Sequence, residues 1–271
     1  MDIAGIAPAT SKSYLRSIRD LSLHFDALPA DLSTDQILDH LHFYKEQKKV
    51  GSSTLNTRIC GIRFYYREVL QRPDMEFHIP NPRRRVKPLA EIIPRRELKT
   101  ILDCCGRNEK HRAIFMLLYS SGMRLSEICN LKVSDVDRDN MQLCIRNGKG
   151  NKDRFTILSK IALKQVEIYY RQARPQNGWL FNGQRKGEPM HRRSVQHALV
   201  QILKRTKISR HINVHTFRHT FAVHFLESGG HLMQLQILLG HKHLTTTLHY
   251  LNHCNLKFDP PISPLDAWWN Q

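Results

Sequence analysis

The segment IPNPRRRVKP, at residues 79–88, places the strongest constraint on how this chain of 271 residues folds. It combines three prolines with four basic residues, a composition that disfavours helix and sheet and suits an extended, charged connector. The chain on either side of it is long enough to bury a core of its own. The sequence therefore predicts two domains, residues 1–79 and 93–271, joined by a basic, proline-rich linker at residues 80–92.

The first domain carries the periodicity of short amphipathic helices. Apolar residues at spacings of three and four predict one helix over residues 11–28, with Leu28 on its buried face. A second helix is predicted between Ser33 and Gly51, and it opens with a capping-box pattern. A third is predicted over residues 52–69. We expect a small all-α domain.

The second domain mixes helices with a small β-sheet. Residues 141–158 predict two strands around an Asn-Gly pair, which is the strongest short signal for a hairpin. Gly122 is expected to end the helix before it in a left-handed conformation. Helices are predicted over residues 95–104, 111–121, 160–174, 191–205, 215–228, 231–239 and 245–252. The fold class is therefore mainly α with a small β-sheet.

The charge of the chain indicates a polyanionic partner. Lys and Arg number 42 against 24 Asp and Glu, so the formal net charge is +18, within the range of nucleic-acid binders. Residues 1–88 hold 14 basic and 10 acidic side chains, which leaves 28 and 14 for residues 89–271. The second domain carries most of the positive field.

The chain shows no sign of export or membrane insertion. Its first residues lack the basic flank and apolar run of a signal peptide, and no stretch approaches the roughly 20 apolar residues of a membrane span. We expect a soluble, cytoplasmic protein without a membrane partner. The six cysteines form no C-x-x-C pair, which favours reduced thiols over disulfides or a zinc site.

Several polar residues of the second domain fall at positions that suit chemistry. Arg124 follows a helix cap, and Lys149 lies at the tip of the predicted hairpin. His215 and Arg218 are three residues apart, so one helix face would carry both. Two short helices later come His241 and Tyr250. Each residue alone is unremarkable, and the set gains its meaning from the combination.

This set resembles the tyrosine recombinase family, also called phage-type integrases, and in particular its compact Xer-like members. The matching stretches are YSSGMRLSEICNLKVSDVD, IRNGKGNKDR, VHTFRHTFA, LLGHKHLTTT and LHYL. The resemblance implies an N-terminal helical core-binding domain and a C-terminal mixed α/β catalytic domain. It also implies six catalytic residues, namely Arg124, Lys149, His215, Arg218, His241 and Tyr250.

The family chemistry that this resemblance implies breaks and rejoins DNA strands without metal, ATP or other cofactor. Tyr250 would attack a backbone phosphate and form a 3′-phosphotyrosyl link, while two arginines stabilise the charge on the phosphate oxygens. Tyrosine needs a proton acceptor at neutral pH, and His215 is the predicted base. His241 would orient the phosphate or share in proton transfer, and Lys149 would protonate the departing 5′ oxygen.

The same resemblance implies the partners. They are a double-stranded DNA core site and a homo-tetramer that acts on two such sites. The C-terminal tail, with Trp268 and Trp269, would dock on a neighbouring subunit or pack within its own chain. The sequence does not separate integration of a mobile element from excision, transposition or resolution of chromosome dimers. The target DNA sequence and any accessory factor are equally open.

Rival interpretations remain for the whole chain and for single residues. One is a non-catalytic DNA-binding or architectural protein of the same fold; another is a metal-dependent nuclease, since His215 and His219 have metal-ligand spacing, although no third ligand is evident. Lys152 competes with Lys149 for the role of acid. Glu127 is expected to support Arg124 by an ion pair or a contact at the helix start.

Overall fold

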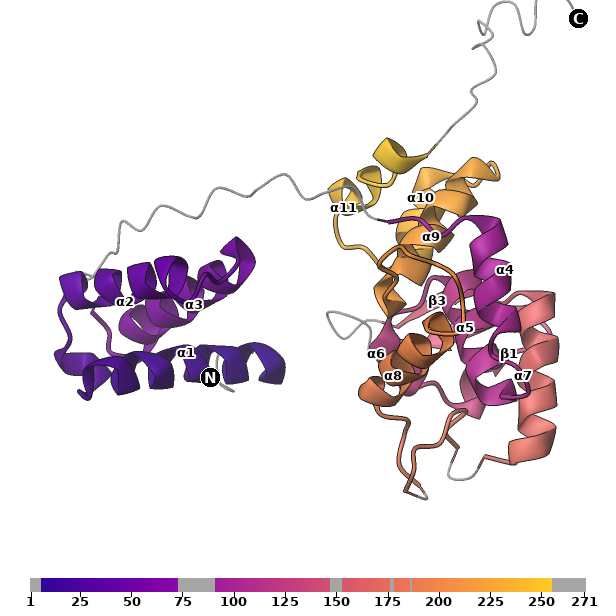
Figure 1. The fold of residues 1–271 in the computed structure, drawn as a ribbon, viewed down its shortest axis with the longest axis horizontal. Coiled ribbons are helices and arrows are strands. Elements are labelled where there is room, and N and C mark those ends of the chain that lie inside the picture. Colours follow the sequence, from indigo (N-terminus) through magenta and orange to yellow (C-terminus); the bar gives the residue numbers. More distant parts are fainter. Residues whose placement is uncertain (1–5, 73–90, 147–152, 176–177, 186, 255–271) are drawn as a thin grey trace, which may run out of the picture. The chain divides into compact units, whose positions relative to one another are not determined.

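The computed structural model describes residues 6–72, 91–146, 153–175, 178–185 and 187–254. The chain divides into two compact units, one on each side of the Pro88–Leu89 bond (Figure 1). The domain boundaries predicted at residues 79 and 93 stay predictions, because residues 73–90 lie outside the described ones. The described residues include no helix that is long and apolar enough to cross a membrane.

The described part of the first unit is helical. Helix α3 packs against both α1 and α2, so the three form one small bundle. The elements are α1 (Pro8–Phe25), the 3₁₀ turn η1 (Pro29–Asp31), α2 (Thr34–Glu46), α3 (Ser52–Phe64) and the π-helical turn η2 (Tyr65–Val69). Their shared core is formed by Leu21, Leu32, Ile37, Leu41, Leu55, Ile59, Ile62 and Tyr66.

The predicted capping box at the start of α2 is confirmed. The Ser33 hydroxyl accepts a hydrogen bond from the backbone N–H of Gln36, whose side chain accepts one from the backbone N–H of Ser33. The predicted end of this helix at Gly51 is wrong, since α2 ends at Glu46. The first helix also begins earlier than predicted, because a proline at Pro8 suits the first helical position.

Two apolar residues that the helical pattern placed in the core are exposed. Leu28 is 69% exposed, because Asp26 adopts a left-handed conformation (φ 48°) and the chain leaves α1 before the next turn. Val69 is 53% exposed. It lies in η2, where the wider π-helical turn shifts later side chains off the buried face of α3.

A histidine is buried in the core of the first unit. The ring of His40 in α2 is fully buried, and among the described residues neither ring nitrogen has a hydrogen-bond partner. Burial, together with the charges of His24 and Arg58, lowers the pKa of His40 to about 4. Arg58 lies over the neighbouring Tyr44 ring, with its guanidinium carbon 3.6 Å from the ring centroid. A proton on His40 would therefore be poorly solvated and would face a second cation.

We predict that the first unit loses stability as the pH falls from about 6.5 towards 4. In this window the unfolded state takes up a proton on His40 that the folded state resists. The free energy of unfolding therefore falls by up to about 3 kcal/mol, since one pKa unit is worth about 1.4 kcal/mol. Above the ordinary pKa of histidine the effect vanishes. Hydrogen exchange of the α2 amides at pH 7.5 and pH 5, corrected for intrinsic rates, measures it. His40→Leu should retain its protection at pH 5; equal wild-type protection at both pH values would contradict the prediction.

The second unit places helices around a small antiparallel sheet. The strands are ordered β1 (Val136–Asp137), β2 (Gln142–Ile145) and β3 (Arg154–Ile157). The β2–β3 pair is the predicted hairpin, in register with Leu143 opposite Thr156; its tip, residues 147–152, lies outside the described residues. The short strand β1 was not predicted, because two residues are too few to show alternation.

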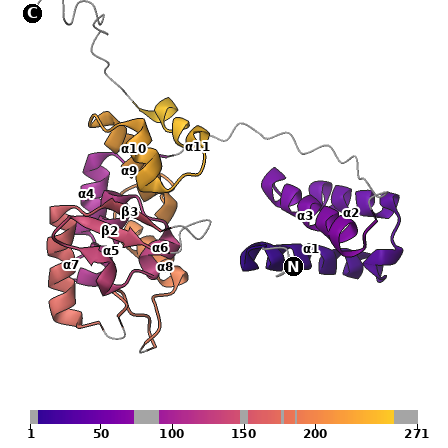
Figure 2. The ribbon, with the colours of Figure 1, turned by 180° about the vertical axis from the view of Figure 1, so that it is seen from behind.

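The described helices of the second unit are labelled in Figure 2, and they match the predicted ranges to within a few residues except for α6 (Leu125–Cys129), which was not predicted. Helix α5 is central and contacts both α7 and α9. The helices are α4 (Arg95–Asp103), α5 (Glu109–Ser121), α6 (Leu125–Cys129), α7 (Lys160–Ala173), α8 (Arg192–Leu203), α9 (Val214–Glu227), α10 (Leu232–Leu239) and α11 (Leu244–Leu248), with 3₁₀ turns η3 (Val133–Asp135) and η4 (Leu251–His253).

The packing of α9 fixes the end of α5 and the segment that ends at η4. Phe115 of α5 stacks on Phe217 of α9, with ring centroids 5.5 Å apart. Gly122 ends α5 with the predicted left-handed conformation (φ 63°), and a Cβ there would lie 2.4 Å from the ring of Phe221. A smaller cluster of buried residues joins α9 and α10 to the segment that ends at η4. It consists of Phe221, Ala222, Val223, Leu226, Leu235, Leu239 and Tyr250.

Candidate active site

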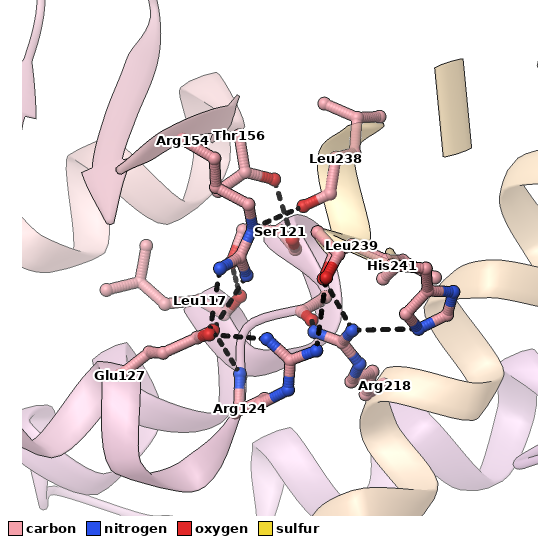
Figure 3. A network of polar contacts seen from close by, with 12 residues as sticks. Leu117, Ser121, Arg124, Glu127, Arg154, Thr156, Arg218, Leu238, Leu239 and His241 are labelled. Atoms are coloured by element: carbon pink, nitrogen blue, oxygen red, sulfur yellow. Dashed lines mark hydrogen bonds and ion pairs between the residues drawn. The ribbon is translucent and has the colours of Figure 1, made fainter. Parts of the chain in front are cut away.

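The guanidinium of Arg218 is held at the meeting point of two helix ends. Its side chain extends from α9 and is only 1% exposed. One terminal nitrogen donates to the carbonyl of Gly122 at 2.7 Å, and the other to the carbonyl of Leu239 at 2.6 Å (Figure 3). These carbonyls lie at the C-terminal ends of α5 and α10, which attract a cation. Burial and the charge of Arg124 lower the pKa of Arg218 to about 10, so the group stays charged at neutral pH.

Arg124 lies directly before α6 and is held by the predicted partner. Its side chain donates to Glu127 Oε1 at 2.8 Å, and its backbone N–H donates to Oε2 of the same carboxylate at 2.7 Å. A second guanidinium nitrogen lies 3.5 Å from the carbonyl oxygen of Gly240. The expected ion pair between Glu127 and Arg124 is thus confirmed, and it fixes the arginine close to the end of α10.

A third arginine, which the sequence analysis did not single out, completes this network. Arg154 at the start of β3 binds both oxygens of Glu127, at 2.8 and 2.7 Å, and donates to the carbonyl of Leu238 at 2.9 Å (Figure 3). Burial tends to raise the pKa of Glu127, but the bonds and charges of Arg154 and Arg124 outweigh it and lower this pKa to about 2. Gly240 (φ 64°) leaves room for Arg154, since a Cβ there would lie 2.8 Å from the arginine Cδ.

His241 is fixed from both ring nitrogens. Nε2 lies 3.1 Å from a terminal nitrogen of Arg218, and Nδ1 lies 2.9 Å from the Thr247 hydroxyl oxygen. A guanidinium only donates, so Nε2 accepts and the ring hydrogen sits on Nδ1. Burial and the charge of Arg218 lower the pKa of His241 to about 4. The ring is therefore neutral at neutral pH, and both of its nitrogens are hydrogen-bonded, to Arg218 and to Thr247.

Tyr250 lies directly before η4, and its ring is 6% exposed. Its hydroxyl oxygen lies 3.2 Å from Nδ1 of His219, and its ring is nearly parallel to that of His241, with centroids 6.2 Å apart. Burial raises the pKa of the phenol above its ordinary value, although the charge and hydrogen bond of Arg218 and the charge of Arg124 oppose this. At neutral pH the hydroxyl is protonated.

His215 lies in the first turn of α9. Its backbone N–H donates to the side chain of Asn213, and its exposed ring lies edge-on to the ring of His219, with centroids 4.4 Å apart. Loss of surrounding water and the charges of Arg218 and Arg124 lower the pKa of His215. It is a neutral imidazole at neutral pH, close to the guanidinium groups of Arg218 and Arg124.

Five of the six predicted residues thus lie in one neighbourhood of the second unit. Four are linked directly or through one partner around the ends of α5 and α10: Arg124, Arg218, His241 and Tyr250. His215 joins them through His219. Lys149, the sixth, and its competitor Lys152 lie outside the described residues.

Comparisons with known proteins decide the family of this chain. The model of the phage integrase family matches residues 91–256, and that of the phage integrase N-terminal SAM-like domain matches residues 1–75. The chain belongs to the phage integrase family. The predicted resemblance to compact, Xer-like tyrosine recombinases is confirmed, and the chain is a site-specific recombinase.

Individual relatives cover nearly the whole chain. "Putative integrase/recombinase y4qK" of Sinorhizobium fredii is 33% identical over 98% of this chain and 86% of its own length. Tyrosine recombinase XerA of Thermococcus kodakarensis is 30% identical over 92% of this chain and 86% of its own length. Among solved structures, a lambda integrase dimer on a COC' core site has a TM-score of 0.72 at 17% identity. The match covers 95% of this chain and 93% of the integrase chain. A XerH post-cleavage complex with difH substrate has a TM-score of 0.67 at 20% identity. The match covers 83% of this chain and 70% of the XerH chain.

The structure adds three residues that sequence reasoning missed or misjudged. Arg154 is the last residue of the matching stretch IRNGKGNKDR, and its charge at the start of a strand was the available signal. His219 was considered only as a metal ligand, and the described residues contain no cluster of three or more metal-ligating side chains. Thr247 gave no signal, because its contact with His241 depends on how α11 folds back.

We predict that Arg154→Ala destabilises the second unit strongly. The change leaves the carboxylate of Glu127 buried with only Arg124 to compensate it, and breaking such a pair costs about 3–5 kcal/mol. Thermal unfolding followed by circular dichroism measures the loss. The control is Arg185→Ala, because Arg185 makes an exposed, 3.8 Å pair with Glu188 and should cost less than about 1 kcal/mol. Equal melting temperatures for the two variants would show that the buried network contributes little.

Proposed function

We propose that this recombinase cuts and rejoins DNA through a covalent 3′-phosphotyrosyl link to Tyr250. The observation that carries the proposal is the convergence of two charged guanidinium groups, Arg124 and Arg218, with a buried tyrosine hydroxyl. Arg218 acts on the phenol through its charge and a hydrogen bond, and Arg124 through its charge. An anion placed beside these arginines would lie next to the nucleophile.

The arginines are suited to stabilise the attacked phosphate. Attack on a phosphodiester concentrates negative charge on the non-bridging oxygens, and fixed guanidinium donors bind such oxygens without reorganising. Arg218 cannot swing away, because it is tied to the carbonyls of Gly122 and Leu239. Arg124 is more accessible, with 24% of its side chain exposed, and is oriented by Glu127.

The remaining roles follow the sequence prediction. Tyr250 oxygen bonds to phosphorus as the bond from phosphorus to the 5′ oxygen breaks, and that oxygen takes a proton from Lys149. Rejoining reverses these steps with a free 5′ hydroxyl, so the bond energy is conserved in the ester. His241, neutral and bound to Arg218, orients the guanidinium on the phosphate. His215 is exposed and close enough to the two arginines for their charges to lower its pKa, and its role as the base stays a prediction.

The partner in this proposal is double-stranded DNA, bound at a core site by both units. The strongly basic composition of residues 89–271 supports it. So do the similar solved structures, since the lambda integrase dimer and XerH are DNA complexes. Four subunits acting on two sites, with exchange of C-terminal tails, complete the proposal on the basis of the family resemblance; Trp268 and Trp269 of that tail lie outside the described residues.

The alternative is a DNA-binding or architectural protein that retains the fold without the chemistry. The two functions differ in what happens to the tyrosine oxygen. A binding protein has no use for the hydroxyl of Tyr250 or for a lysine close to a leaving group, whereas both are indispensable to a recombinase.

Tyr250→Phe is predicted to abolish the covalent protein–DNA adduct and to leave DNA binding intact. Wild-type protein is mixed, in chelator, with nicked fragments from its genetic neighbourhood, and adducts are sought on a denaturing gel. Tyr170→Phe is the matched control, since Tyr170 is an exposed tyrosine of α7. Tight binding without adduct for wild type on all fragments would favour the architectural protein, and an adduct that survives in Tyr250→Phe would exclude Tyr250 as the nucleophile.

Lys149→Ala is predicted to slow cleavage by about 10²–10⁴-fold, the usual contribution of a general acid. The loss should largely disappear when the 5′ bridging oxygen of the substrate is replaced by sulfur, because a thiolate leaves without a proton. Lys152→Ala is the comparison, and single-turnover cleavage is the measurement. If the sulfur substrate restores Lys152→Ala instead, the acid is Lys152.

A further inference from the structure

The hydroxyl of Tyr250 is held by a histidine that the family-based assignment leaves without a role. Nδ1 of His219 lies 3.2 Å from the hydroxyl oxygen, and the two ring centroids are 5.6 Å apart. We propose that His219 is the general base that takes the proton of Tyr250 as the tyrosine attacks the phosphate. This inference rests on the proposed function and changes the assignment of one step within it.

The position of His219 on α9 explains the contact. It follows Arg218 directly and lies one helical turn after His215, so it is on the same side of the helix as the predicted base but closer to the middle of the helix. His219 is half-buried, whereas His215 is exposed. The ring of Tyr250 contacts His219 and His241, and the ring of His215 contacts that of His219.

The other histidine that contacts Tyr250 is unsuited to accept the proton. His241 Nε2 accepts from Arg218, and its Nδ1 hydrogen faces the Thr247 hydroxyl. Both nitrogens are therefore engaged, and the adjacent guanidinium opposes a further positive charge on this ring. His219 can present an unprotonated Nδ1 to the phenol while its ring hydrogen is on Nε2.

The buried phenol makes an adjacent base necessary. Burial keeps the pKa of Tyr250 above its ordinary value in spite of the two arginines. A base within hydrogen-bond reach removes the proton as the new bond forms, so no free phenolate has to be populated beforehand.

The step balances within the protein and its substrate. The Tyr250 oxygen loses its proton to His219 Nδ1 and bonds to phosphorus, and the 5′ oxygen leaves with the proton of Lys149. His219 becomes an imidazolium, and it returns the proton to Tyr250 when a 5′ hydroxyl reverses the step. His215, next to Arg124 and Arg218 in the exposed part of the site, is then free to donate a hydrogen bond to the phosphate.

Two variants separate proton transfer from positioning. In His219→Asn the amide oxygen takes a place close to that of Nδ1 and still accepts a hydrogen bond from the phenol, but it cannot take the proton. His219→Ala removes both functions. The matched control is His224→Asn, because His224 lies on the same helix and its Nδ1 is 3.0 Å from the hydroxyl oxygen of another tyrosine, Tyr119.

The experiment is single-turnover cleavage of a nicked substrate by the full chain, with DNA affinity measured in parallel. We expect both His219 variants to be slower than wild type by about 10²-fold or more, with unchanged DNA affinity, and His224→Asn to match wild type. Added imidazole should partly restore His219→Ala and should not restore Tyr250→Phe. With a sulfur leaving group the His219 defect should persist, which distinguishes a base from an acid.

Each other result has a defined meaning. If His219→Asn cleaves within about threefold of wild type while His219→Ala is slow, His219 only positions the tyrosine and the base assignment is overturned. If both variants cleave like wild type, or if imidazole fails to restore a folded His219→Ala, the inference is overturned while the proposed function stands. Absence of a Tyr250-dependent adduct in wild type would overturn the proposed function, and this inference with it.

Discussion

The buried guanidinium of Arg218 ties together the parts of the second unit that the site requires. It binds the last carbonyls of α5 and α10 and also contacts His241. The end of α5, helix α9 and the end of α10, which are distant in sequence, therefore meet at one side chain. Such a cation tolerates burial because helix C-termini present partial negative charge and because all its contacts accept hydrogen bonds. The main core, with Phe115 stacked on Phe217 one residue earlier in α9, supplies the rigid base for this junction.

The charge balance of the site also points to its substrate class. The guanidinium groups of Arg124 and Arg154 bind the carboxylate of Glu127, and that of Arg218 lies close enough to be affected by its charge. The nearby histidines, His215 and His241, are kept neutral. The surplus is therefore positive and fixed in place before any ligand arrives. An anion that fills this region gains attraction without requiring the protein to reorganise, which is the electrostatic condition for stabilising a phosphate under attack.

The sequence predicted the elements well and the side-chain network only in part. Helical periodicity and the Asn-Gly hairpin signal located α5, α7, α9 and the β2–β3 pair, because these depend on local pattern. The family motifs named Arg124, His215, Arg218, His241 and Tyr250, which the structure brings together in one neighbourhood. The errors came from backbone details and long-range contacts: the left-handed Asp26 that ends α1 early, the π-helical turn that exposes Val69, and the pairing of Arg154 with Glu127 across 27 residues. None of these leaves a periodic trace in the chain.

The placement of Tyr250 has a consequence for how this protein can change over generations. The ring is part of a small apolar cluster with Phe221 and Leu235, whereas the hydroxyl oxygen lies beside His219 and would attack the phosphate in the proposed mechanism. The fold depends on the ring, and the hydroxyl contributes only about one hydrogen bond to stability. Under the proposed function, a single nucleotide change that replaces Tyr250 by Phe would remove the activity and keep the fold. Such a descendant would bind the same DNA without cutting it, and it would compete there with the active enzyme.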